Sequence, residues 1–120
     1  MNFIHPFPNF VSRDLYRDRL EAIRHFSHDP KFDLYGHGWN APVRYEDGRY
    51  HESIVRSYRG EIPKKLSVLQ NYKFSICFEN NIFGGLVTEK IIDCIFAGCI
   101  PVYWGAPDIT DYVPKNCFID

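Results

Sequence analysis

The sequence has 120 residues, enough for one small domain and too few for two. Hydrophobic residues make up 45% and charged residues 24% of the chain, which excludes a disordered tail, a collagen-like repeat and a coiled coil. The formal net charge is −1, and neither half is basic enough to indicate a nucleic-acid partner. Any site for an anion must therefore be built from a few local groups.

Neither a membrane anchor nor a secretion signal is expected within this sequence. No apolar run approaches the roughly 18–20 residues that a membrane span needs, and the first residues lack a basic region followed by an apolar stretch. The four cysteines form no C-x-x-C pair, and we expect buried, reduced thiols rather than zinc ligands. They are Cys77, Cys94, Cys99 and Cys117.

The first half of the chain alternates short apolar runs with breakers. An amphipathic helix is expected where Leu15, Leu20, Ile23 and Phe26 fall on one face, before the breaker Asp29-Pro30. The expected elements are a strand end at 3–4, a helix over 12–28, a short strand over 32–35, mostly loop over 39–60 and a helix over 63–71.

The second half gives the clearest pattern. Residues 73–78 are nearly continuously apolar, which predicts a strand covered on both faces. A Gly84-Gly85 loop follows, and Thr88 is expected to cap a helix that ends at Gly98. Residues 99–104 predict the next strand. The expected buried face of the helix is Ile91, Ile92, Ile95 and Phe96.

The order of strand, loop, helix and strand predicts that the two strands are parallel, because the helix carries the chain back to the edge of the sheet where the first strand began. The fold class is therefore α/β: a Rossmann-like, doubly wound parallel sheet with strands near 3–5, 32–35, 73–78 and 100–104. Ligands of such sheets bind beyond the carboxyl ends of the strands. Here that edge is made by residues 79–89.

The loop before Thr88 is a candidate anion site. Unpaired backbone N–H groups and the positive end of a helix dipole favour an anion there. Lys90 puts a positive charge where it is unfavourable for the helix itself, which points to a functional reason, whereas Glu89 also fits as an ordinary first-turn acid. Neither a dinucleotide fingerprint nor a P-loop is present.

The segment FEN-NIFGG-LVTEK, from Phe78 to Lys90, resembles the hallmark of the α-1,3-fucosyltransferase family (glycosyltransferase family 10). The similarity continues through IIDCIFAGCIPVYWGAPDITDYVPKNCFID, and upstream LYRDRLEAIRHF and FDLYGHGW are similar to the family. The resemblance implies the nucleotide-binding, C-terminal half of a two-domain GT-B glycosyltransferase. Residues 1–120 would form a single, partial domain, incomplete at both ends.

The resemblance also implies the chemistry. Fucose would move from GDP-fucose to a hydroxyl of an acceptor oligosaccharide with inversion, with no obligatory metal or other cofactor. An N-terminal acceptor domain would be the partner of this chain and would supply the general base. The implied location is the Golgi membrane in a eukaryote, or the cytoplasm or membrane periphery in a bacterium.

The resemblance assigns roles residue by residue. Lys90 and Arg19 would stabilise the diphosphate of the leaving group, with Arg17 and Arg13 as alternatives to Arg19. The residues expected to bind the donor substrate are Asn80, Thr88, Glu89, Lys90 and Arg19.

One position departs from the family pattern. Leu86 stands where the family carries a tyrosine that contacts the donor, and leucine cannot form that hydrogen bond. Three alternatives therefore stay open: a non-catalytic or degenerate GDP-sugar-binding fragment, a GT-B transferase for another nucleotide-sugar, and an α/β module without a ligand.

Overall fold

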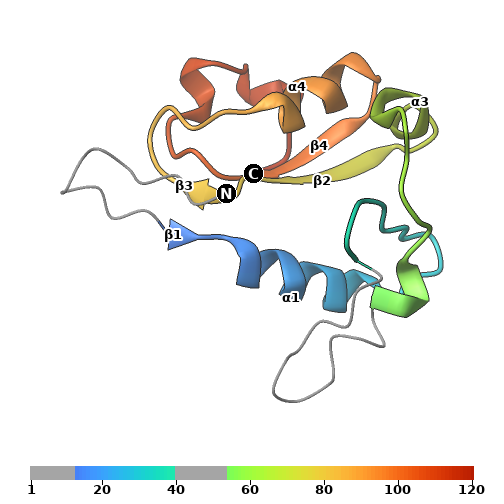
Figure 1. Cartoon of the computed structure of the whole chain (residues 1–120). Helices are drawn as coiled ribbons and strands as arrows, with labels where there is room; N and C mark the ends of the chain where they lie inside the picture. The colour runs from blue at the N-terminus through green and yellow to red at the C-terminus, as the bar shows by residue number, and fades with distance from the viewer. Residues whose placement is uncertain (1–12, 40–53) are drawn as a thin grey trace.

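The computed structural model describes residues 13–39 and 54–120 (Figure 1). The strand end expected at 3–4 and residues 40–53 of the expected loop lie outside this part. Residues 54–57 form one helical turn where a loop was expected. The named elements are β1 (Arg13–Asp14), α1 (Tyr16–Phe26), α3 (Lys65–Leu69), β2 (Phe74–Phe78), β3 (Asn81–Ile82), α4 (Glu89–Phe96), β4 (Ile100–Trp104), η1 (Ile109–Asp111) and η2 (Lys115–Cys117).

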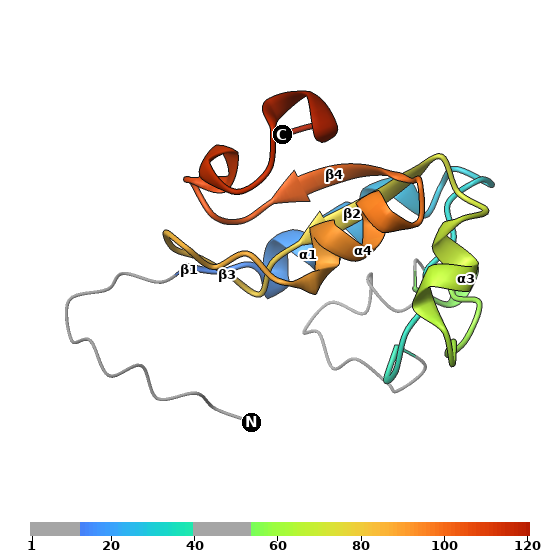
Figure 2. The same ribbon diagram turned by 90° about the horizontal axis from the view of Figure 1, so that it is seen from above.

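The centre of the fold is the parallel pair of β2 and β4, joined through α4. The pairing runs from Phe74 opposite Ile100 to Phe78 opposite Trp104, which confirms the predicted strands and their direction. In Figures 1 and 2, α4 lies on one side of this pair and α1 on the other. The chain is thus a mixed α/β structure with a parallel sheet.

The prediction of a full strand over 32–35 is wrong, because the structure has a single bridge there. Leu34 alone forms a parallel bridge, to Tyr58. The Gly36 N–H still donates to the Gly60 carbonyl over 3.1 Å, and the positive φ angles of Gly36 and Gly38 then end the extended conformation. A second parallel bridge, between Val102 and Ile119, continues the sheet beyond β4. Among the described residues, the isolated bridge that extends the β2–β4 pair is therefore the one at Val102, whereas the bridge of Leu34 joins two segments outside this pair.

The helix expected over 12–28 begins later, at Tyr16. Arg13 and Asp14 form β1, which pairs antiparallel with β3 and so cannot join the helix. The Leu15 N–H then donates to the Asn80 carbonyl over 2.9 Å. These contacts bring the start of α1 beside the carboxyl end of β2. The helix expected over 63–71 is likewise shorter, at Lys65–Leu69.

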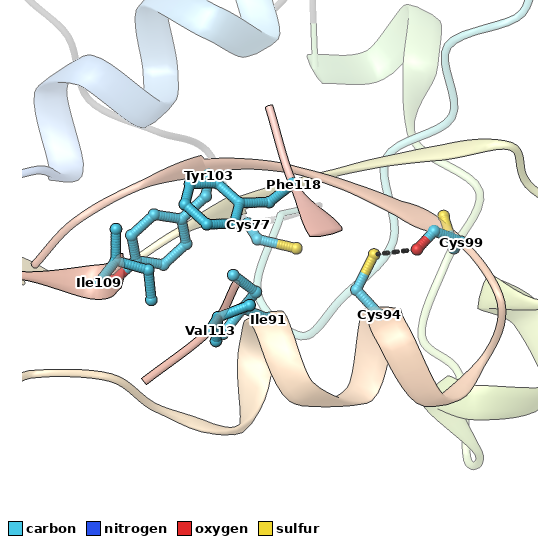
Figure 3. Close-up of a cluster of buried hydrophobic side chains, with 8 residues drawn as sticks. All are labelled: Cys77, Ile91, Cys94, Cys99, Tyr103, Ile109, Val113 and Phe118. Atoms are coloured by element: carbon cyan, nitrogen blue, oxygen red, sulfur yellow. Dashed lines mark hydrogen bonds between the residues drawn. The ribbon is translucent and has the colours of Figure 1, made fainter. Parts of the chain in front are cut away.

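The main core lies between the sheet and α4, and Figure 3 shows its side chains. The expected buried face of α4 is only partly correct. Ile91 is buried, but Ile92 and Ile95 are partly exposed and Phe96 is 82% exposed. Cys94 takes the inward position instead, because residues three apart share the face toward the sheet. The core consists of Cys77, Ile91, Cys94, Cys99, Tyr103, Ile109, Val113 and Phe118.

Burial differs from the sequence-based expectation in two further places. In β2 only Cys77 is fully buried and Phe74 is exposed, so this strand is not covered on both faces along its length. A second core cluster forms around Leu20 and Ile23 of α1, while Phe26 at the end of that helix is exposed. The most exposed side chains, Phe74 and Phe26, lie at a strand or helix end, where fewer neighbours cover them.

Three of the four free cysteines are buried as expected, whereas Cys117 is exposed. The Cys94 thiol donates to the Cys99 carbonyl over 3.4 Å, and burial raises the pKa of the Cys99 thiol. Within the described ranges, no helix has the length and apolar character needed to cross a membrane.

Candidate anion-binding site at the end of β2

Thr88 is the N-cap of α4, as the sequence predicts. Its backbone is extended, and its hydroxyl oxygen accepts a long hydrogen bond of 3.5 Å from the Lys90 N–H. This is the geometry of a helix N-cap, in which a side-chain oxygen satisfies one of the free N–H groups of the first turn. The cap fixes where the side chains of Glu89 and Lys90 leave the helix.

Glu79, directly after β2, is the main feature that sequence reasoning missed. It is fully buried, with 0% of its surface exposed. Its Oε1 accepts from the Thr88 N–H over 2.9 Å, and its Oε2 accepts from the Thr88 hydroxyl over 2.7 Å. The available signal was a carboxylate at the end of an apolar strand, shortly before a helix start that attracts negative charge.

The ammonium of Lys90 bends back over the cap toward the sheet. Its Nζ lies 3.0 Å from Thr88 Oγ1 and 3.3 Å from Glu79 Oε2. The side chain is 24% exposed, so the charged end still reaches solvent. Glu89 is farther from this ammonium, at 3.8 Å, and its side chain is 67% exposed. Lys90 is thus held at the carboxyl edge of the sheet.

Arg19 approaches the same edge from α1. Its Nη2 donates over 3.0 Å to the Phe78 carbonyl and over 3.0 Å to Asn80 Oδ1. Burial lowers the pKa of the Arg19 guanidinium, although this group stays protonated in proteins. Arg17 is exposed on the same helix, and Arg13 lies in β1. Arg19, the first choice among the three arginines, therefore meets the end of β2.

The glycine loop differs from its prediction in one respect. The Gly85 N–H, expected to be unpaired, donates to Asp108 Oδ1 over 2.9 Å. The Thr88 N–H is likewise engaged, by Glu79. Carboxylates of the chain itself therefore already accept from two backbone N–H groups of this loop. The cationic side chains are then the main candidates for binding an anion. Leu86 lies half buried between these two positions.

Residues at the end of β4 pack against Glu79. Tyr103 is buried, its hydroxyl oxygen accepts from the Ala106 N–H over 2.9 Å, and burial raises its pKa. A Cβ on Gly105 would lie 2.5 Å from the Tyr103 hydroxyl oxygen and 2.6 Å from Glu79 Cγ. Glycine is therefore required for the close approach of this backbone to Glu79.

The arrangement places one ammonium and one guanidinium at a single sheet edge, each held by groups of the chain. Such fixed cations suit a diphosphate, whose charge they can offset without reorganising. Within residues 13–39 and 54–120, no three His, Cys, Asp or Glu side chains gather as they would around a metal ion.

Comparison with known proteins places the chain in a family. Residues 9–120 match the family described as "Glycosyltransferase family 10 (fucosyltransferase) C-term". The chain therefore belongs to glycosyltransferase family 10, the fucosyltransferases, as the FEN…TEK hallmark predicted.

Individual relatives agree with this assignment. An α-(1,3)-fucosyltransferase, FucT, from Helicobacter pylori is 48% identical over 87 residues, covering 64% of this chain and 18% of the relative. α-(1,3)-Fucosyltransferase B from Drosophila melanogaster is 37% identical over 67 residues, covering 54% and 15%. The human GDP-fucose protein O-fucosyltransferase 3 is 41% identical over 49 residues, covering 41% and 10%. The chain thus matches less than a fifth of the length of each relative.

Proposed function

We propose that the protein is a fucosyltransferase that transfers fucose from GDP-fucose to a hydroxyl of an acceptor glycan. This chain would be the donor-binding part, a Rossmann-like half of a GT-B enzyme formed by residues 1–120 as one partial domain. The observation that carries the proposal is the convergence of Lys90 and Arg19 on the carboxyl edge of β2. Membership of the family supports the choice of GDP-fucose as donor.

In the proposed reaction the acceptor oxygen attacks C1 of fucose from the face opposite GDP. The bond from C1 to the β-phosphate oxygen breaks, the configuration at C1 inverts, and GDP leaves with the bonding electron pair. The acceptor proton passes to a general base that we expect on the N-terminal acceptor domain. No metal ion or other cofactor takes part in this scheme.

The chain's own residues act on the leaving group. Negative charge grows on the β-phosphate as the bond breaks, and Lys90 and Arg19 stabilise it where it develops. Glu89, exposed beside Lys90, binds hydroxyls of the donor, and Asn80 contacts the donor from the end of β2. Thr88 supports the diphosphate from the cap.

A second candidate function is a GDP-sugar-binding protein without transferase activity, or a GT-B transferase for another nucleotide-sugar. The observation that favours it is Leu86, which cannot supply the hydrogen bond of the family tyrosine. The relatives carry both α-(1,3)-fucosyltransferase and protein O-fucosyltransferase names, so the acceptor needs its own test. A glycan hydroxyl is our proposal.

The test uses the full-length protein. Calorimetry with GDP, GDP-fucose, GDP-mannose and a UDP-sugar compares the donors, and an assay of fucosyl transfer to glycan and protein acceptors measures turnover. We expect the tightest donor binding for GDP-fucose, with release of GDP in the presence of a glycan. Tighter binding of another sugar nucleotide would favour a different donor, and binding without transfer would favour the non-catalytic alternative.

A further inference from the structure

A fully buried carboxylate is a costly residue at the end of a strand. Removing a charge from water is unfavourable unless hydrogen bonds and an opposite charge compensate for it, and an apolar side chain would fill the same space without that requirement. Glu79 has both kinds of compensation, from the Thr88 backbone N–H and hydroxyl and from the Lys90 ammonium. A polar group placed against this general preference indicates a role beyond packing.

Glu79 also restricts the position of Lys90. An ammonium has three N–H donors, and two of them are directed at Glu79 Oε2 and Thr88 Oγ1. Thr88 itself is held by both carboxylate oxygens of Glu79. One donor of Lys90 is left for a ligand, and the flexible lysine side chain is fixed before any ligand arrives.

The surroundings of Glu79 keep its carboxylate in place. Its Cγ is approached closely by the backbone of Gly105, at the end of β4. The carbonyl of Glu79 lies 3.4 Å from Arg19 Nη2. Glu79 is therefore in contact with both cations of the site, through its side chain with Lys90 and through its backbone carbonyl with Arg19.

We propose that Glu79 is a positioning residue, which orients the Lys90 ammonium toward the β-phosphate of the bound nucleotide. The inference rests on the proposed function, because it requires a diphosphate at this edge. Glu79 does not touch the substrate and acts through Lys90 and the Thr88 cap. The consequence is that Glu79 contributes to binding of the β-phosphate and leaves contacts with the rest of the nucleotide unchanged.

The test measures the affinities of GDP and GMP for the full-length protein, because the two ligands differ in the β-phosphate. In Glu79→Gln we expect the preference for GDP over GMP to fall at least tenfold, as expected when one charged hydrogen bond is lost. GMP affinity should stay near that of the unchanged protein. Glu79→Asp keeps the charge on a shorter side chain and should restore part of the preference. This second variant gives a reading even if Glu79→Gln fails to fold.

A double-mutant cycle tests whether Glu79 acts through Lys90. In Glu79→Gln/Lys90→Ala, GDP affinity should be no lower than in Lys90→Ala alone, because the group that Glu79 orients is already absent. Glu61→Gln, the same change at an exposed carboxylate, is the matched control and should leave the preference intact.

The outcomes separate this inference from the proposed function. If the unchanged protein binds GDP no better than GMP, both are overturned. If it prefers GDP and Glu79→Gln keeps that preference, only the positioning role is overturned. Equal losses for GDP and GMP, or losses that multiply in the double variant, would show a structural role instead.

Discussion

At the scale of single residues, Leu86 stands where the resemblance to the family implies a tyrosine. It lies half buried in the loop between β3 and α4, with its N–H donating to the Phe83 carbonyl over 3.3 Å. Leucine keeps bulk at this position and offers no donor to a phosphate. We expect Leu86→Tyr to raise GDP-fucose affinity about tenfold or more, since a hydrogen bond to a charged group contributes about 1.5–3 kcal/mol.

Leu86→Phe is the matched control for this prediction, because it adds the ring without the hydroxyl. Titration calorimetry on both variants measures the difference. Equal affinities in the two variants would mean that the ring, and not a hydrogen bond, makes the contact.

At the scale of elements, the ends of β2 and β4 depend on the close approach at Gly105. Gly105→Ala would force its Cβ to within 2.6 Å of Glu79 Cγ, so we expect a loss of about 1–3 kcal/mol in the free energy of unfolding. In Gly84→Ala the nearest atom would be 3.4 Å away, at Asp108 Oδ2, and the loss should be clearly smaller. Urea denaturation measures both. Similar losses for the two variants would contradict a specific clash at Gly105.

The elements that the sequence predicts best are those with strong, continuous patterns. β2, α4 and β4 were predictable because their sequences show an apolar strand, a capped helix and a second apolar strand. Gly84-Gly85 and Gly98 separate these three elements. The two-residue strands β1 and β3 were not, because so short a pairing leaves no periodic pattern in the sequence. The start of α1 was placed too early for the same reason.

The residues of the candidate site were predictable where their charge and their position along the chain indicated a role. Lys90, Thr88 and Arg19 meet at one edge, as the hallmark and the sheet topology suggested, although their roles remain predictions. Two features were not predictable: the face of α4 that is buried, with Cys94 inward, and the burial of Glu79. Both depend on packing against β4. Apolarity alone predicted that Phe96 is buried, whereas no prediction was made for the burial of Glu79.

At the scale of the whole molecule, stability should depend on alkaline pH through Tyr103. Burial, aided by nearby carboxylates, raises the pKa of Tyr103 above its ordinary value of 10.0. Above pH 10.0 the phenol ionises in the unfolded chain and stays protonated in the folded one. The unfolded state then binds fewer protons at Tyr103, so the contribution of Tyr103 to the free energy of unfolding is constant below this pH and is lost as pH rises through the folded pKa.

Tyr103→Phe removes this contribution. The variant should be less stable at neutral pH by about 1–3 kcal/mol, because the buried Ala106 N–H loses its acceptor. Its stability should then decline less steeply above pH 10.0, as followed by urea denaturation at a series of pH values. Identical slopes for the two proteins would contradict the assignment.

The most direct measurement of the central claim is the turnover of Lys90→Ala in the full-length protein with GDP-fucose as donor. Loss of a fixed cation from the leaving group should lower turnover about a hundredfold or more. Lys64→Ala is the control, because it removes the same charge from an exposed position beside α3, which precedes β2. An undiminished rate in Lys90→Ala would contradict the claim that this edge of the sheet holds the diphosphate.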